Sequence, residues 1–175
     1  MIALPTWFAN LVLLPGKMAH TVMTKSLTQR YNLKIHSINY LEIAPDRSQI
    51  IYDSPNTLKE KYAVGIGPFI ILNSIALGLY YLALTADRTL LFLLFAYLGV
   101  SCSYASFPTI EIIHELWKAT MQGVKKGDFI AILFLIPVAI IGIIKFLSIL
   151  GVEILFAVGL LIWLSIVLKI NPFEN

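Results

Sequence analysis

Long uncharged apolar segments alternate along this chain with shorter segments that hold its charges. Residues 63–84 and 89–110 contain no Asp, Glu, Lys or Arg. The hydrocarbon core of a bilayer is about 30 Å thick, and roughly 20 residues of helix cross it. Each of these segments is therefore predicted to be a transmembrane helix. Residues 129–144 and 154–168 are also uncharged, and they reach the required length if Lys145 and Lys169 extend their ammonium groups to the membrane surface.

The first apolar segment is long but interrupted. Residues 3–14 are mostly apolar, Pro15-Gly16-Lys17 interrupts them, and residues 18–23 resume the pattern. The segment is too long for a secretory signal and too polar at its end, and it lacks a basic start. A helix over residues 4–24 is predicted to cross the membrane and to carry Lys17 and His20 toward its far end.

These segments predict an all-α integral membrane protein in which residues 1–175 form a single membrane domain. With 58% hydrophobic residues and a mean hydropathy of +0.82, the composition excludes a soluble globular protein. The last two apolar segments are also short enough to form a re-entrant pair instead of two complete crossings. About five transmembrane helices are expected, at approximately residues 4–24, 63–84, 89–108, 129–145 and 150–169.

Five alternating crossings sort the basic residues to one side of the membrane. Eleven of the thirteen Lys and Arg residues fall on one side, and only Arg88 and Lys145 fall on the other. Basic loops stay in the cytoplasm, so we expect a multi-pass protein of the cell membrane with its N-terminus outside and its C-terminus cytoplasmic. The net charge of +3 then reflects topology. We expect membrane lipid and other membrane proteins as partners, and no nucleic acid.

The cytoplasmic segment after the first helix predicts a small β-hairpin. Residues 33–43 and 48–53 mix β-branched and aromatic residues with polar ones, and residues 44–47 between them carry a turn signal. The hairpin is expected at approximately residues 33–53, in the headgroup region or against protein, because an open sheet edge is unstable in lipid. Residues 109–122 mix apolar and charged positions, which is typical of an interfacial helix.

Ionisable residues at membrane depth are candidates for function because they are costly to place there. His20 lies three residues after Lys17, on the same helix face. The alternatives are that Lys17 reaches the membrane surface and that His20 packs beside a hydrogen-bonding neighbour. Glu111, His114 and Glu115 of the interfacial helix are predicted on the same side of the membrane as the end of the first helix. With His20, they are the candidates for a metal site.

Residues 15–24, Pro-Gly-Lys-Met-Ala-His-Thr-Val-Met-Thr, resemble the first-helix motif of the site-2-protease-like intramembrane zinc metalloproteases. In that family His-Glu-x-x-His places two zinc-binding histidines one helical turn apart with the general-base glutamate beside them, and a β-hairpin follows. Residues 65–74 are similar to the Gly-Pro…Asn stretch of small bacterial and archaeal members. Residues 106–109 are similar to the Phe-Pro-Ser turn that precedes their third ligand, an aspartate. The resemblance covers approximately residues 1–120.

The resemblance implies a degenerate catalytic motif. His20 matches the first zinc ligand, but Thr21 stands at the glutamate position and Thr24 at that of the second histidine. Ile112 stands at the aspartate position, and the adjacent Glu111 points about 100° away around the helix. Zinc hydrolases need three protein ligands and an activated water. The resemblance therefore implies no catalytic residue, no bound zinc and no other cofactor.

Two functions from different classes follow. The first is a catalytically inactive, metalloprotease-like pseudoenzyme that binds a partner helix or peptide in the former substrate groove, with the hairpin edge available for β-strand addition. The alternative is a small accessory subunit of a larger membrane protein complex, whose helices serve as packing surfaces. A transporter is less favoured, because no predicted span carries paired interior charges. An active protease is least favoured, and the sequence does not identify the partner-binding residues.

Overall fold

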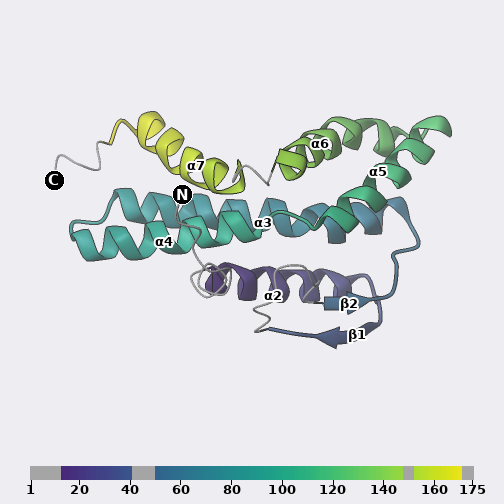
Figure 1. The fold of residues 1–175 in the computed structure, drawn as a ribbon, viewed down its shortest axis with the longest axis horizontal. Coiled ribbons are helices and arrows are strands. Elements are labelled where there is room, and N and C mark those ends of the chain that lie inside the picture. Colours follow the sequence, from purple (N-terminus) through teal and green to yellow (C-terminus); the bar gives the residue numbers. More distant parts are fainter. Residues whose placement is uncertain (1–12, 41–49, 148–151, 171–175) are drawn as a thin grey trace.

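The computed structural model describes residues 13–40, 50–147 and 152–170 (Figure 1). Helices predominate in the described part, and two short strands form an antiparallel sheet, so the predicted helical fold with one β-hairpin is confirmed. The elements are α2 (Leu14–Arg30), β1 (Ile35–Ile38), β2 (Ile50–Tyr52), α3 (Leu58–Leu84), α4 (Thr89–Ala105), α5 (Ile110–Lys125), α6 (Phe129–Phe146) and α7 (Val152–Leu168).

Helices that can cross a membrane are present among the described residues. Both α3 and α6 are long and apolar enough, and the pair α4 and α5, which is bent by 52°, passes the same criteria if it counts as one broken span. The described part therefore contains two or three such candidates, which is compatible with a multi-pass membrane protein. Residues 4–12 of the predicted first crossing and residues 148–151 lie outside the described residues.

Helix α3 is the axis on which the other helices pack. A capping box starts it, in which the Thr57 side chain accepts from the Glu60 backbone N–H and the Glu60 carboxylate accepts from the Thr57 N–H. The helix continues through Pro68 for 27 residues, a length of about 40 Å. Helices α4 and α5 follow one another back along α3 in the opposite direction (Figure 1).

Helices α6 and α7 both run in the same direction as α3. Phe134 of α6 stacks on Tyr62 near the start of α3, with ring centroids 4.3 Å apart. Further along, the Tyr80 hydroxyl of α3 donates to the carbonyl oxygen of Ala157 in α7 at 2.8 Å. The sequence predicts that residues 129–145 and 150–169 cross the membrane in opposite directions. In the structure, the corresponding helices α6 and α7 run in the same direction, so this prediction differs from what is observed. As a consequence, the end of α7 points toward the same end of the molecule as the α3–α4 turn (Figure 1).

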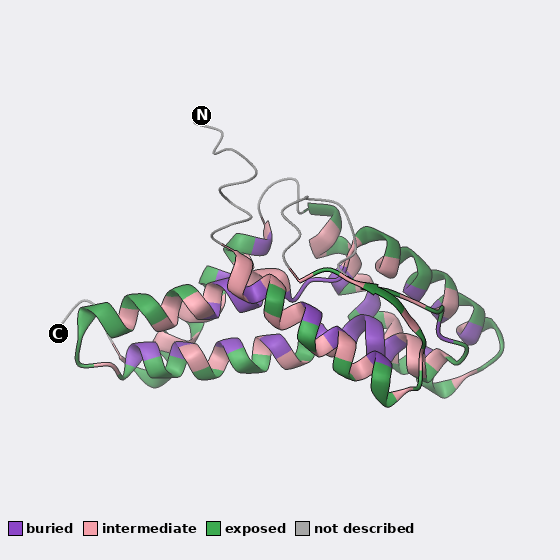
Figure 2. Ribbon diagram, turned by 90° about the horizontal axis from the view of Figure 1, so that it is seen from below, coloured by how far each residue is buried: buried purple, intermediate pink, exposed green. Residues whose placement is uncertain are grey.

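Helix α2 packs against the middle of α3 and α4. Its Gly16 N–H donates to Ser101 Oγ at 2.9 Å, and a methyl group added at Gly16 would lie 1.9 Å from the Ser101 carbonyl oxygen. This contact therefore requires glycine. Thr21, Thr24 and Thr28 form the buried face of α2, whereas the outward faces of the helices are exposed (Figure 2).

The hairpin and the amphipathic helix form close to their predicted positions. Ile35 pairs with Tyr52 and Ile38 with Ile50, with an irregularity between Ile35 and Ser37; the predicted turn lies outside the described residues. Helix α5 begins after Thr109, whose side chain accepts from the Ile112 N–H. Ile112, Ile113 and Leu116 of α5 pack toward α3 and α6. Its charged residues are exposed, and so are the apolar Ile110, Trp117 and Met121.

Candidate functional site

The four positions that the resemblance aligns with the metalloprotease motif lie on α2 and α5. His20 is partly exposed, and the buried Thr21 donates its hydroxyl to the carbonyl oxygen of Lys17 at 2.9 Å. Thr24 is 6% exposed, and its hydroxyl has no hydrogen-bond partner among the described residues. Ile112 packs against the apolar cluster at the start of α3. Thr21 thus uses its hydroxyl within its own helix, and Ile112 is a packing residue.

The metal-site candidates remain apart. Glu111, His114 and Glu115 are exposed on α5, whereas His20 lies on α2. Among the described residues, no three His, Cys, Asp or Glu side chains come together in a group that could hold a metal ion. The four-residue site considered from the sequence is therefore not assembled in the described part of the chain.

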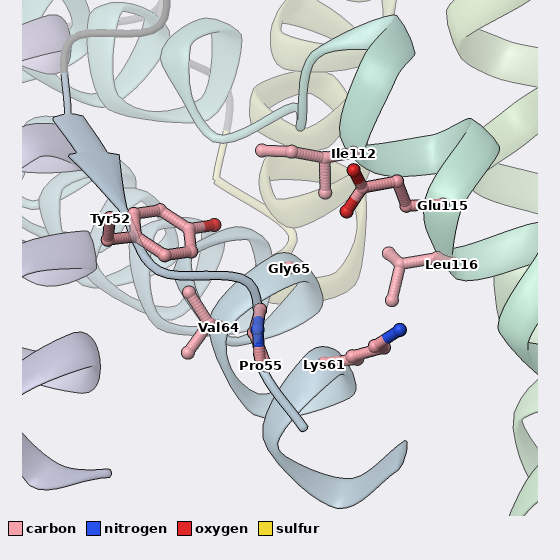
Figure 3. Close-up of a pocket in the computed structure, with 8 residues that line it drawn as sticks. All are labelled: Tyr52, Pro55, Lys61, Val64, Gly65, Ile112, Glu115 and Leu116. Carbon is pink, nitrogen blue, oxygen red and sulfur yellow. The ribbon is translucent and has the colours of Figure 1, made fainter. Parts of the chain in front are cut away.

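A pocket lies at the base of the hairpin, between the end of β2, the first turns of α3, and α5 (Figure 3). We call it the hairpin pocket. Val64, Gly65, Ile112 and Leu116 form its apolar floor, with Pro55 beside them, and polar groups of Tyr52, Lys61 and Glu115 form its rim.

The rim of the hairpin pocket carries charges of both signs. The Tyr52 hydroxyl and the Glu115 carboxylate both point into the pocket, and Lys61 lies at its edge (Figure 3). Burial, and secondarily the negative charge of Glu115, raise the pKa of Tyr52 above its ordinary value. Tyr52 therefore stays a neutral donor at physiological pH. Such a site can bind a molecule with both donors and acceptors over an apolar group.

The pocket floor is closed by a helix contact at Gly65. A methyl group added there would lie 2.9 Å from Leu116 Cδ1 and 3.1 Å from Ile112 Cγ2. Sequence reasoning missed the pocket because Tyr52, Lys61 and Glu115 come from three separate elements. No local spacing of residues signals their convergence.

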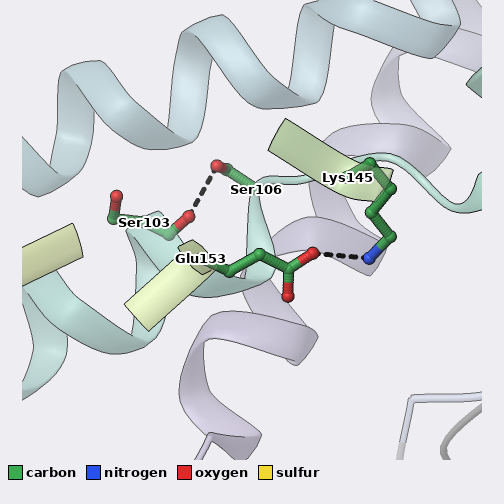
Figure 4. Close-up of polar contacts among 4 residues, drawn as sticks. All are labelled: Ser103, Ser106, Lys145 and Glu153. Atoms are coloured by element: carbon green, nitrogen blue, oxygen red, sulfur yellow. Dashed lines mark hydrogen bonds and ion pairs between the residues drawn. The ribbon is translucent and has the colours of Figure 1, made fainter. Parts of the chain in front are cut away.

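A second group of polar residues lies where α4 ends and α7 begins (Figure 4). Lys145 Nζ donates to Glu153 Oε1 at 2.6 Å, and these side chains are only 21% and 8% exposed. The Asn73 amide donates to Ser106 Oγ at 2.8 Å, and Ser103 Oγ donates to Asn73 Oδ1 at 2.7 Å. The chain thus contains a paired interior charge, which the sequence reasoning did not anticipate.

The ion pair escaped the sequence reasoning because its members belong to different segments. Lys145 flanks one predicted span, and Glu153 lies in the opening turn of the next helix. A lone acidic residue in an otherwise apolar segment is the signal that could have found it.

No protein-family model matches the chain, and neither a curated protein nor a solved structure is similar to it. The resemblance to intramembrane metalloproteases therefore rests on the motif residues alone.

Proposed function

We propose that this chain is a non-catalytic membrane protein that binds an extended peptide segment of a partner protein at its β-hairpin. The observation that carries the proposal is the hairpin pocket, which adjoins the end of β2. A small apolar side chain fits its floor, and the rim groups of Tyr52, Lys61 and Glu115 suit the donors and acceptors of a peptide main chain.

The sheet itself supports peptide binding. It has two strands in the described part, so each strand pairs on one side only, and a further strand can add to an outer edge. An extended peptide directs alternate side chains to one face, which lets one of them enter an adjacent pocket while the main chain pairs. Main-chain pairing at the sheet edge thus provides affinity for the peptide, and the pocket provides selectivity for one of its side chains.

The absence of catalysis in this proposal follows from residue chemistry. A general base must accept a proton near neutral pH, and a threonine hydroxyl does not. Thr21 stands at the base position and donates to the carbonyl oxygen of Lys17, and the aspartate position is the apolar Ile112. The former catalytic face thus offers packing surface.

The hairpin end of the molecule is proposed to face the cytoplasm. Lys59 and Lys61 start α3, and the exposed Lys125 and Lys126 lie at the end of α5 beside them, since Gly123 packs against Leu58. Arg88 lies at the opposite end. Basic segments stay in the cytoplasm. Because α7 runs parallel to α3, the described C-terminal residues then lie at the non-cytoplasmic end.

Site-specific photo-crosslinking tests the proposal. A photoreactive amino acid at Glu115 should capture one partner from native membranes, and the yield should fall several-fold when Tyr52→Ala is added. The same amino acid at Gln122, which is also exposed on α5 but does not line the pocket, is the matched control. Equal capture at both positions, or capture unaffected by Tyr52→Ala, would contradict a peptide site at the hairpin pocket.

A further inference from the structure

The three polar side chains at the rim of the hairpin pocket are available to a ligand. Neither Tyr52, Lys61 nor Glu115 uses its side chain in a hydrogen bond or ion pair with another described residue. The Tyr52 hydroxyl, from β2, and the Glu115 carboxylate, from α5, point toward one another across the pocket (Figure 3). The pocket thus presents unused hydrogen-bond donors and an unused acceptor above one apolar floor.

The charges at this rim disfavour a charged ligand group. Lys61 carries a positive charge and Glu115 a negative one, and Tyr52 is neutral because burial and the Glu115 charge raise its pKa. A carboxylate placed among the three groups is repelled by Glu115, and an ammonium is repelled by Lys61. The rim therefore favours a ligand group that is neutral.

The floor and the rim together also disfavour a wholly apolar ligand group. Val64 and Leu116 in the floor are only 2% and 3% exposed, so an aliphatic stem can lie on them. A side chain such as leucine would, however, displace water from the rim and offer it no hydrogen bond. Polar groups that lose water without a replacement partner weaken binding.

A carboxamide has the donors and acceptor that this rim lacks. Its carbonyl oxygen has two lone pairs, which can accept from the Tyr52 hydroxyl and the Lys61 ammonium, and its NH₂ group can donate to the Glu115 carboxylate. A serine hydroxyl can also donate and accept, but its stem of one carbon covers less of the apolar floor. The main-chain amides of a peptide paired with the sheet edge are already used, so the carboxamide must come from a side chain.

We propose that the hairpin pocket selects a carboxamide side chain, that of asparagine or glutamine, in the peptide that the β-hairpin binds. This inference rests on the proposed function and adds the chemical identity of the side chain that enters the pocket. Tyr52, Lys61 and Glu115 are its specificity-determining residues. Lys61 and Glu115 exclude side chains of like charge, and all three bind the amide.

Peptide binding to the full chain in lipid nanodiscs tests the proposal. The probes are end-capped peptides with threonine, valine, isoleucine and serine mixed at the flanking positions and one residue fixed at the centre. Central glutamine is expected to bind about tenfold tighter than central glutamate, lysine or leucine, and several-fold tighter than serine. Glutamine and glutamate have nearly the same shape, so that pair isolates the effect of charge.

Two charge variants should switch the preference. Glu115→Gln removes the repulsion of a carboxylate, so the preference for glutamine over glutamate should disappear. Lys61→Met leaves Glu115 without a cation at the rim, so peptides with central lysine should bind several-fold tighter than they do to the native chain. Glu111→Gln and Lys118→Met are the matched controls, because both residues are exposed on α5 but do not line the pocket, and they should leave the preferences unchanged.

The outcomes separate this inference from the proposed function. Equal affinities for all central residues, or preferences that neither rim variant changes, would overturn carboxamide selection while peptide binding stands. Loss of affinity for every peptide alike in both rim variants would show that the rim supports the fold and does not select, and would also overturn it. No binding of any peptide by the folded native chain would contradict the proposed function as well.

Discussion

The two ends of α3 differ in the size of the buried residues that pack there. Near its start, Tyr62 and Ile66 meet Leu116, Val138 and Ile141 in a cluster of large apolar side chains. Near its end the buried cluster is made of smaller residues, Ala76 and Cys102 beside Tyr80. A methyl group at Gly99 would lie 2.4 Å from the Tyr80 ring, and the Tyr80 hydroxyl donates to a main-chain carbonyl of α7.

This difference is the one expected if the start of α3 lies outside the lipid and its end lies within it. Apolar association is driven by water, so it stabilises helices at the membrane surface. Within lipid, helices gain little from apolar contact alone and instead use small residues and interhelical hydrogen bonds. Three rings lie between the two regions, with Phe107 at 5.2 Å from both Phe69 and Phe156. The packing thus changes at the level where α4 and α6 end.

The ion pair between Lys145 and Glu153 lies where the two packed regions of α3 meet. Breaking this pair is expected to have the largest effect on stability. Lys145→Met leaves Glu153 buried without its partner, and we expect a loss of about 3–5 kcal/mol in the free energy of unfolding. Thermal unfolding in lipid nanodiscs measures it. The double variant with Glu153→Leu should recover most of the loss, because two apolar side chains leave no uncompensated charge. A double variant as unstable as the single one would show that other contacts of these side chains matter more.

A small-residue contact is the next largest test. Gly16→Ala places a methyl group 1.9 Å from the main-chain oxygen of Ser101, so α2 must shift, and we expect a loss of about 1–3 kcal/mol. Gly78→Ala is the matched control, since nothing lies within 4 Å of its added methyl group. That control should be neutral or slightly stabilising because alanine favours helix. Equal destabilisation by both would show that close approach is not what Gly16 provides.

The sequence predicted the elements of the fold better than their directions. Uncharged runs predict α3, α4, α6 and α7, and the alternation of residues 33–53 predicts the hairpin. Both signals are patterns of neighbouring residues within one segment of the chain, so a single sequence displays them. The direction of α7 relative to α6 is not local. An alternating topology places Lys169 beside the basic loops, whereas contacts of Phe156 and Ala157 with α3 carry α7 toward the Arg88 end.

The sites were harder to predict for the same reason. His20 stood out because its motif is contiguous, but the pocket residues Tyr52, Lys61 and Glu115 converge only after β2, α3 and α5 have packed. Lys145 and Glu153 likewise meet across two helices. A single sequence displays spacing within an element, and it does not display which elements become neighbours.

One substitution made at each end of α3 sharpens the comparison further. Tyr62→Phe removes a 2.7 Å hydrogen bond to Thr120 Oγ1, and Tyr80→Phe removes a 2.8 Å bond to the Ala157 carbonyl. Each should cost about 1 kcal/mol. Hydrogen exchange followed by mass spectrometry should show faster exchange in α5 and α6 for the first variant, and in α4 and α7 for the second. Faster exchange throughout the chain in both variants would mean that the two ends open as one unit.

The smallest expected effect lies at the hairpin, outside both packed regions. His36 Nε2 lies 2.6 Å from Asp53 Oδ1, with the two side chains 48% and 54% exposed, so solvent and salt screen the pair. His36→Gln should cost less than about 1 kcal/mol. It should speed exchange of the Asp53 N–H, which donates to the Lys34 carbonyl oxygen at 2.9 Å, without changing the unfolding temperature of the helices. Ser37→Ala, exposed on the same strand, is the control. If His36→Gln leaves exchange of the Asp53 N–H as slow as in the native chain, the hairpin does not depend on this contact for its order.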